Sequence, residues 1–230
     1  GIGEGCVRRF AEKGHYVVAI GRNKDKLREL SEQLGDKLIP VEYDLIDLSN
    51  IDNIYNICRQ QAVRFDGMVY SAGMDNMSPV KVNSIQKMRT TMDVNCFAFA
   101  EMGRLFYSKR YSNNGASIVA VSSMASLVND IGMMAYSASK AALNSVVKTM
   151  AKEFVGREIR VNAILPGGVD TPMAREKNRV LMKSDEQIEK GQPLGLIHVE
   201  HIVDEIEYLL SPKAHFMTGE LITISGGMRY

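Results

Sequence analysis

The chain has 230 residues, of which 45% are hydrophobic and 24% are charged, and its formal net charge is +1. This length and composition are ordinary for a single globular domain with one core, and the near-neutral charge gives no indication of nucleic-acid binding. The longest apolar stretches are shorter than a membrane helix, and no signal peptide opens the sequence, so we expect a cytoplasmic single-domain protein, residues 1–230.

Disulfide and metal chemistry are not indicated either. The three cysteines, Cys6, Cys58 and Cys96, are widely spaced and each lies within a helical pattern, so we interpret them as reduced core residues. His198 and His201 are close in sequence, but the carboxylates that follow them belong to an ordinary amphipathic helix. We therefore predict no metal site.

The opening stretch, residues 1–14, places Gly1 and Gly3 directly before an amphipathic helix. The free N–H groups and dipole of a helix N-terminus attract phosphate, and glycines allow close approach of a ligand to the backbone. In a dinucleotide-binding unit a strand leads into such glycines. We therefore expect a first strand before Gly1 that is missing from this sequence.

After this helix, strand and helix patterns alternate along the chain. Short apolar runs predict strands at residues 15–22, 37–43, 67–73, 117–122, 159–164 and 220–225. Apolar residues at helical spacing predict helices at residues 24–34, 49–62, 84–109, 136–154 and 199–210. This alternation implies an α/β fold, a doubly wound parallel sheet with helices on both faces in three α/β/α layers.

Ligands of doubly wound sheets bind beyond the carboxyl ends of the strands. The predicted strands end in small or polar residues, namely Gly21-Arg22, Asp44-Leu45, Ser71-Ala72-Gly73, Ser122-Ser123 and Pro166-Gly167. We therefore expect the functional site at this edge. A polar, weakly helical segment at about residues 173–197 is predicted to form a lid over it.

Tyr136 and Lys140 lie four residues apart in a predicted helix and therefore share one face of it. An ammonium group beside a phenol favours the phenolate, which lowers a pKa that is otherwise about 10. Together with a nearby serine hydroxyl, such a pair can protonate or deprotonate an oxygen bonded to carbon. Alone, the pair is equally typical of a surface helix on which a Tyr packs against a Lys stem.

In combination, these motifs resemble the classical short-chain dehydrogenase/reductase family over essentially the whole chain. The matching motifs are Gly1-Ile2-Gly3 for the end of its glycine-rich loop, Asp44-Leu45 for its adenine contact, Ser71-Ala72-Gly73 for its central turn, Asn95 for its helix asparagine, Ser123 thirteen residues before Tyr136, and the PGGVDTPM segment beginning at Pro166 for its nicotinamide loop. Ser71 departs from the pattern, because the family has Asn at this position.

The resemblance implies a Rossmann fold and reversible hydride transfer between a nicotinamide and a carbonyl carbon. Tyr136 is then the general acid, and Ser123 donates a hydrogen bond to the substrate oxygen. Lys140 lowers the pKa of Tyr136 and holds the nicotinamide ribose, whereas Asn95 supports a water that replenishes the proton. The alternative for Asn95 is a buried polar residue that steadies a helix, and Ser122 is interpreted as strand structure.

The resemblance also implies cofactor contacts at Pro166 and Gly167, at the backbone of Val169 and at the side chain of Thr171. Sites that prefer NAD place an acidic residue about twenty positions after the glycines. Here that neighbourhood is Gly21-Arg22, and a guanidinium can bind a 2′-phosphate with charge-assisted hydrogen bonds. We therefore predict NADP(H) in preference to NAD(H), the alternative being an ordinary solvated Arg.

The expected substrate is a 3-oxoacyl thioester, a ketone or a sugar-derived carbonyl, since the closest resemblance is to 3-oxoacyl-[acyl-carrier-protein] reductases and to reductases of surface polysaccharides. The predicted pocket consists of the lid and of Met74, Asn129, Asp130, Ile131, Met133 and Gly168. An acyl-carrier partner would need a basic patch, for which the lid offers Arg175, Lys177, Arg179 and Lys183; a solvated lid face is the alternative.

Family resemblance further suggests a homotetramer that is built on the long helices with Asn95 and Tyr136. The apolar residues expected to supply this interface are Cys96, Phe97, Phe99, Met102, Phe106, Leu143, Val147 and Met150. A competing hypothesis is a catalytically silent relative of the same fold that acts as a redox sensor or binding module. Such proteins usually lose the Tyr or the Lys, and this chain has both.

Overall fold

A computed structural model describes residues 1–60, 64–180 and 191–228, in which helices and parallel strands alternate. The strands are β1 (Val17–Gly21), β2 (Leu38–Glu42), β3 (Phe65–Tyr70), β4 (Ser112–Val121), β5 (Arg160–Pro166) and β6 (Leu221–Ile224). The helices are α1 (Ile2–Glu12), α2 (Lys24–Leu34), α3 (Ile51–Gln60), α4 (Ile85–Met92), α5 (Ala98–Phe106), α6 (Met134–Glu153), α7 (Pro172–Val180) and α9 (Val199–Leu210).

Within these residues the strands form two groups, a β1-β2 pair and a four-stranded sheet with the order β3-β4-β5-β6. Every pairing is parallel, so the carboxyl ends of the strands meet at one edge within each group. All of β5 and the part of β4 from Ala116 to Val121 are continuous runs of buried residues, as expected of a parallel sheet that is covered on both faces.

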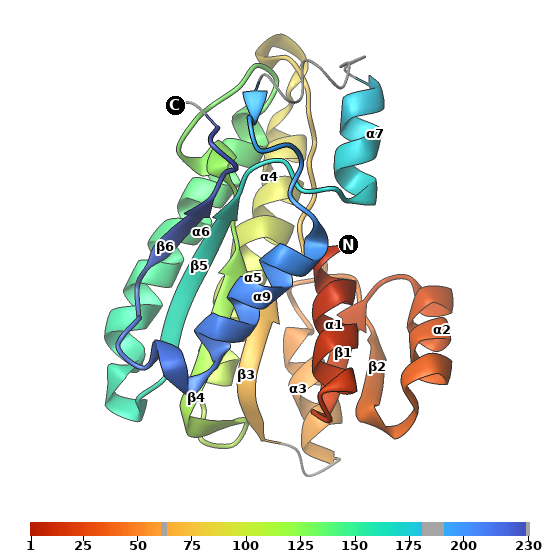
Figure 1. The fold of residues 1–230 in the computed structure, drawn as a ribbon, viewed down its shortest axis with the longest axis vertical. Helices are drawn as coiled ribbons and strands as arrows, with labels where there is room; N and C mark the ends of the chain where they lie inside the picture. The colour runs from red at the N-terminus through yellow and green to blue at the C-terminus, as the bar shows by residue number, and fades with distance from the viewer. Residues whose placement is uncertain (61–63, 181–190, 229–230) are drawn as a thin grey trace.

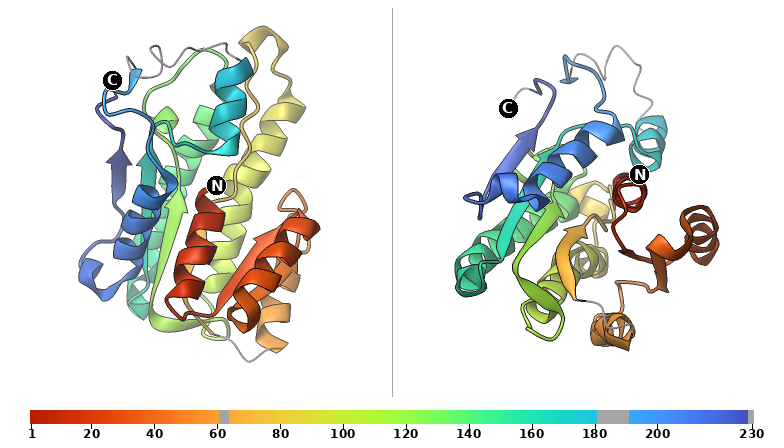
Figure 2. Two further views of the ribbon diagram at one scale, coloured as in Figure 1. Left: turned by 45° about the vertical axis from the view of Figure 1, so that its right-hand side comes forward. Right: turned by 60° about the horizontal axis from the view of Figure 1, so that its bottom comes forward.

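Helices cover both faces of the four-stranded sheet, which confirms the predicted α/β/α arrangement. Helices α1 and α9 lie on one face, and α5 and α6 lie on the other (Figures 1 and 2). The core between the sheet and α5 and α6 includes Phe99, Phe106 and Leu143, all fully buried. The core under α9 is built on Ile202 and Ile206, which are also fully buried.

The helix predicted at residues 84–109 has a discontinuity that the sequence pattern does not indicate. Residues Asp93–Phe97 form a π-helical turn between α4 and α5. The buried hydroxyl of Tyr70, at the end of β3, donates a hydrogen bond to the Val94 carbonyl within this turn. Single π turns inside helices occur frequently at functional sites, and this one contains Asn95.

Part of the predicted lid lies in the described residues. Helix α7 forms its first portion, and residues 191–197 return to the body, where Ile197 pairs with Val169 in an isolated parallel bridge. The remaining lid residues, 181–190, lie outside the described residues. In both Figure 1 and Figure 2, α7 lies next to the start of α1.

Other sequence predictions concern the cysteines and the membrane. Cys6 and Cys96 are buried free thiols, as predicted, and the side chain of Cys58 lies outside the described residues. In the part of the chain that the structure describes, no helix combines the length and apolar character needed to span a membrane.

Candidate active site

The structure brings Ser123, Tyr136 and Lys140 together at the carboxyl end of β4. Ser123 follows this strand in extended conformation, and its hydroxyl hydrogen-bonds to the phenol of Tyr136. Tyr136 lies in the first turn of α6, and Lys140 lies one turn further on, with its Nζ 5.8 Å from the centre of the Tyr136 ring. Two hydroxyls and a cation therefore meet in one place, as the spacing in the sequence predicts.

The neighbouring Ser122 is placed differently. It is 3% exposed, its N–H donates to the Ile164 carbonyl of β5, and its hydroxyl faces the Lys140 carbonyl at 3.4 Å. Ser123 instead begins a short turn in which its Oγ also accepts a hydrogen bond from the Ala125 N–H at 3.1 Å. Of the two serines, only Ser123 presents its hydroxyl to the phenol.

Burial has opposite effects on the two titratable groups, because a low-dielectric environment disfavours whichever form is charged. It raises the pKa of Tyr136 to about 12; the hydrogen bond from Ser123 acts in the other direction, and the charge of Asp75 adds to the rise. It lowers the pKa of Lys140 to about 8. The lowered pKa predicted for Tyr136 is therefore not found, since burial outweighs the hydrogen bond from Ser123, which is the one cause that lowers it.

Lys140 is held by a backbone carbonyl and lies beside the central turn. Its ammonium donates to the Val121 carbonyl at 2.8 Å and is 3% exposed. A Cβ on Gly73 would stand 3.5 Å from both Lys140 Nζ and Asn95 Oδ1. Both side chains therefore lie in van der Waals range of the central turn after β3.

Asn95 is fully buried and uses its amide to clamp neighbouring elements. Its Oδ1 accepts from the Met74 N–H at 2.8 Å, and its Nδ2 donates to the Met74 carbonyl at 3.0 Å and to Ser139 Oγ at 2.9 Å. Ser139 in turn donates to the Tyr136 carbonyl at 2.7 Å. The asparagine therefore links the segment after β3 to the turn of α6 that carries the tyrosine.

The glycines at the start of α1 fit a phosphate-binding role. A Cβ on Gly1 would meet nothing within 4 Å, whereas a Cβ on Gly3 would stand 2.4 Å from Ser71 Oγ. Gly1 is thus open, and Gly3 permits α1 to pack closely against the end of β3. Among the described residues no side chain caps the N-terminus of this helix, so its N–H groups can donate hydrogen bonds to an anion. Ile2 and Ala72 fix the start of α1 and the central turn to the body of the protein, since each packs against a buried hydrophobic cluster.

The ends of β1 and β2 form the other half of this edge. Arg22 and Asp44 are both exposed, and Leu45 packs partly into the core. Asp44 Oδ1 accepts from the Ile46 N–H at 3.1 Å and so fixes the turn after β2. Glu42 pairs with Gly21 in the strand register, and its carboxylate lies 3.9 Å from Lys24 Nζ, so an acidic side chain that the sequence pattern did not indicate stands at the end of β2.

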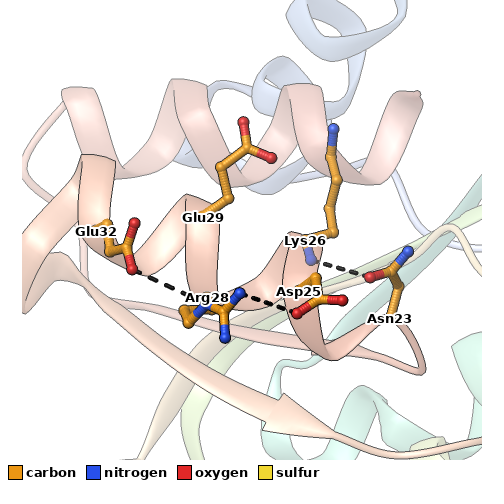
Figure 3. Close-up of a pocket in the computed structure, with 6 residues that line it drawn as sticks. All are labelled: Asn23, Asp25, Lys26, Arg28, Glu29 and Glu32. Atoms are coloured by element: carbon orange, nitrogen blue, oxygen red, sulfur yellow. Dashed lines mark hydrogen bonds and ion pairs between the residues drawn. The ribbon is translucent and has the colours of Figure 1, made fainter.

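A surface hollow on α2 begins one residue after Arg22, but its charged side chains are engaged with one another or, as Lys26 is with Glu4, with neighbouring residues. Arg28 pairs with Asp25 at 3.0 Å and approaches Glu32 at 4.0 Å, and Asn23 caps the helix by accepting from the Lys26 N–H (Figure 3). The hollow lies on α2 rather than beside Tyr136. We interpret it as a solvated helix face.

The loop after β5 is held by a residue that the sequence analysis missed. Gln192 is 2% exposed; its Oε1 accepts from the Gly168 N–H at 2.7 Å, and its Nε2 donates to the Gly168 carbonyl at 3.0 Å and to the Gly195 carbonyl at 2.6 Å. Cβ atoms on Gly167 or Gly168 would stand 2.6 and 3.3 Å from its Oε1. Its position in a polar segment beyond the nicotinamide motif gave no signal of this role.

The same loop contains the predicted nicotinamide contacts. Ile197 bonds to the Gly168 carbonyl and to the Asp170 N–H, so the N–H and C=O of Val169 point away from this pairing, as alternate groups do in a parallel bridge. Thr171 Oγ1 accepts from the Ala174 N–H at 3.2 Å and thereby caps α7. Pro166 is buried at the end of β5.

The predicted pocket and lid residues are only partly brought together. Met133 is buried and Ile131 is 88% exposed, while the Ser78 N–H bonds to the Gly132 carbonyl at 3.0 Å and so joins the two walls. Arg175 forms an ion pair with Asp170 at 2.6 Å and adds little to a basic patch. The side chains of the other residues proposed for that patch, Lys177, Arg179 and Lys183, lie outside the described residues.

The residues expected at a tetramer interface belong instead to the core of this chain. All but Phe97 are buried by their own fold, because α5 and α6 pack on the sheet and on each other at Gly103 and Met150. Phe97 is 48% exposed. The apolar surface inferred from the helical pattern is therefore core surface, and it gives no support to an interface.

Comparison with known proteins adds an independent line of evidence. The family model described as enoyl-(acyl carrier protein) reductase matches residues 1–229. The 3-oxoacyl-[acyl-carrier-protein] reductase of Thermotoga maritima is 30% identical over 99% of this chain and 93% of its own length. A short-chain type dehydrogenase/reductase of Sinorhizobium fredii is 29% identical over 99% of this chain, which spans only 41% of that longer protein.

Among solved structures, a 4-hydroxyisoleucine dehydrogenase complexed with NADH superimposes with a TM-score of 0.90. It is 32% identical in sequence, and the match covers 99% of this chain and 93% of that one. The similarity therefore extends over both the strands and the edge at which the candidate residues gather.

Proposed function

Because the chain belongs to the short-chain dehydrogenase/reductase family of oxidoreductases, we propose that it transfers a hydride reversibly between a nicotinamide cofactor and the carbon of a carbonyl or secondary alcohol. The observation that carries the proposal is the shared position of Ser123, Tyr136 and buried Lys140 at the end of β4. When bound, the nicotinamide supplies or accepts the hydride.

In the direction of reduction, Tyr136 is the general acid. Its raised pKa keeps the phenol protonated at neutral pH, so the proton is available to the substrate oxygen as charge develops there. Ser123 already hydrogen-bonds to this phenol and donates to the same oxygen, which stabilises the developing charge. In oxidation the two groups act in reverse.

Lys140 and Asn95 support this proton transfer without contacting the substrate oxygen. With a pKa of about 8, Lys140 exchanges a proton near neutral pH and is suited to restoring the one that Tyr136 gives up. Asn95 holds the Met74 backbone and, through Ser139, the turn of Tyr136. We propose that it also binds a water that connects Lys140 to solvent.

Residues of the strand edge would hold the cofactor. The N-terminus of α1 at Gly1-Ile2-Gly3 would bind its pyrophosphate, and Asp44 and Leu45 would bind its adenine. Ser71, Ala72 and Gly73 would contact the cofactor through the backbone of the central turn. Pro166, Gly167, Val169 and Thr171 would surround the nicotinamide. The N–H and C=O of Val169, which face away from Ile197, would bind the carboxamide, and Tyr136 and Lys140 would lie beside the ribose.

We propose that the cofactor is NADP(H) in preference to NAD(H), with Arg22 on the 2′-phosphate. Arg22 is exposed and forms no hydrogen bond or ion pair with the described residues, so its guanidinium is available. The Arg22→Ala variant should raise KM for NADPH and leave KM for NADH nearly unchanged. A wild-type kcat/KM that favours NADH would refute this preference. NADH is the cofactor to compare because the acidic Glu42 pairs with Gly21, directly before Arg22, in the strand register.

The substrate we propose is an acyl thioester, a ketone or a sugar-derived carbonyl, handled in the cytoplasm by a homotetramer. Oxidation of NADPH and NADH should be followed against a panel of acetoacetyl thioesters, ketoses and simple ketones. Carbonyl-dependent cofactor oxidation supports the proposed function. A protein that binds the cofactor without turning over any member would favour a binding or sensing role instead, and a monomer in light scattering would contradict the tetramer.

A further inference from the structure

The hydroxyl of Tyr70 is a buried polar group to which the proposed hydride transfer assigns no role. Tyr70 is the last residue of β3 and is 3% exposed, and burial raises the pKa of its phenol well above the usual range. The hydroxyl is therefore always protonated near neutral pH. It donates a hydrogen bond to the Val94 carbonyl, which lies in the π-helical turn Asp93–Phe97 between α4 and α5.

The π turn makes this carbonyl available to Tyr70. The N–H of Ala98 donates to the Asp93 carbonyl, five residues back, whereas in a regular α-helix it would donate four residues back, to Val94. The Tyr70 hydroxyl thus takes the place of that backbone donor. Without the hydroxyl, the buried Val94 carbonyl would lose a donor, and the regular α-helical bond from Ala98 would become the better way to satisfy it.

The side chain that depends on this choice of helix is Asn95, the residue after Val94. Its Oδ1 accepts from the Met74 N–H at 2.8 Å, and its Nδ2 donates to the Met74 carbonyl at 3.0 Å and to Ser139 Oγ at 2.9 Å. Successive residues of an α-helix are rotated by about 100°, so a change from the π to the α pattern would turn the Asn95 amide away from these partners. All three hydrogen bonds therefore require the π turn.

The residues that contact the π turn flank the central turn, Ser71-Ala72-Gly73. Tyr70 comes directly before it and bonds to the π turn through its hydroxyl, and Met74 comes directly after it and bonds through its backbone. Tyr70 also pairs with Ala120 in the sheet. The sheet is therefore the fixed body against which the Tyr70 hydroxyl holds the π turn.

The π turn also contacts the groups that handle the proton. Ser139, which accepts from Asn95, donates to the Tyr136 carbonyl at 2.7 Å. A Cβ on Gly73 would stand 3.5 Å from both Asn95 Oδ1 and Lys140 Nζ, so these two side chains meet at the central turn. The position of Asn95 thus bears on both the proposed acid and the buried lysine.

We propose that Tyr70 is a positioning residue for the reaction. Its hydroxyl selects the π turn over a regular helix, and the π turn places the Asn95 amide against Met74 and beside Lys140. This inference rests on the proposed function and adds to it a residue that acts through Asn95 rather than on the substrate or the cofactor.

The test compares Tyr70→Phe with Tyr55→Phe. Tyr55 is the matched control because it is 2% exposed and its hydroxyl also donates to a helix carbonyl, that of Met102 at 2.6 Å, which belongs to α5 and not to the π turn. Both substitutions keep the aromatic ring, and the ring at position 70 packs against Phe99 with 5.3 Å between centroids. We therefore expect both variants to fold.

Amide hydrogen exchange at Met74, measured relative to the amides of β5, shows whether Asn95 still accepts from this N–H and needs no substrate. Tyr70→Phe should speed the relative exchange by about tenfold. It should also lower kcat for carbonyl-dependent cofactor oxidation by about 5- to 30-fold while changing the Kd for reduced cofactor by less than about threefold. Tyr55→Phe should leave all three values near those of wild type.

Unchanged relative exchange at Met74 in Tyr70→Phe would overturn the inference, as would faster exchange with an unchanged kcat. Equal effects of the two substitutions would also overturn it, because they would show only the loss of a buried hydrogen bond. A wild type that turns over no carbonyl would count against the proposed function itself. Faster Met74 exchange confined to Tyr70→Phe would in that case still support the hold of Tyr70 on Asn95.

Discussion

Replacement of Gln192 by Leu tests how the loop after β5 is held. The substitution keeps much of the side-chain volume but removes the hydrogen bonds to the N–H and C=O of Gly168 and to the C=O of Gly195. Each lost bond contributes about 1 kcal/mol, and buried groups that are left without partners cost more. Since the side chain is 2% exposed, we expect a loss of about 3 kcal/mol in the free energy of unfolding.

In a protein of this size such a loss lowers the Tm by roughly 6 to 12 °C. Thermal unfolding measures it, and titration with reduced cofactor measures the second expected effect, a weaker affinity from a loosened Gly168–Val169 backbone. Gln86→Leu is the control, since Gln86 is exposed on α4. A change in Tm of less than about 2 °C for Gln192→Leu would refute the reasoning, as would equal effects of the two substitutions.

The remaining predictions concern α1 and the buried lysine. In Gly3→Ala the new Cβ would lie 2.4 Å from Ser71 Oγ, so we expect a loss of about 1 to 3 kcal/mol; the double variant Gly3→Ala/Ser71→Ala should recover part of it in urea unfolding, and strict additivity would contradict the contact. Because the pKa of Lys140 falls from 10.5 to about 8 on folding, the unfolded chain binds more protons between these pH values and stability should rise with pH by roughly 3 kcal/mol across that window. The Lys140→Met variant should lack this rise, and an identical pH dependence in both proteins would show that Lys140 is not desolvated.

Much of the fold was predictable because buried parallel strands and amphipathic helices leave strong patterns. The buried stretch from Ile118 to Val121 in β4, for example, is a continuous apolar run in the sequence. The π turn at Asn95 could not be read in the same way, because its extra residue is accommodated by contacts with Tyr70 and Met74, which are distant in sequence. The helical period continues on both sides of it.

The candidate site, too, was predictable where it depends on local spacing and not where it depends on distant contacts. The spacing of Ser123, Tyr136 and Lys140 is local information, and the topology then places all three at one edge. The direction of the pKa change of Tyr136 is not local, since it depends on how much of the fold buries the phenol. Gln192 was missed for a related reason: its importance comes from Gly168 and Gly195, whose polar backbone groups need partners only once the segments are packed together.

The apolar residues of α5 and α6 illustrate the limit of periodicity. The sequence shows that Phe99, Phe106 and Leu143 lie on apolar faces, but not whether a second chain or the sheet covers them. In the structure the sheet does, with each of these residues fully buried. A helical pattern therefore predicts that an apolar face is buried, but it does not show whether the same chain or a second chain covers that face.

The central claim is that Tyr136 gives its proton to the substrate oxygen. The most direct measurement compares wild type with Tyr136→Phe in carbonyl-dependent oxidation of reduced cofactor, with the cofactor Kd measured on both proteins. The account predicts that turnover is abolished while the Kd changes by less than about threefold, since the substitution removes only the hydroxyl. Turnover near the wild-type rate in Tyr136→Phe would contradict it.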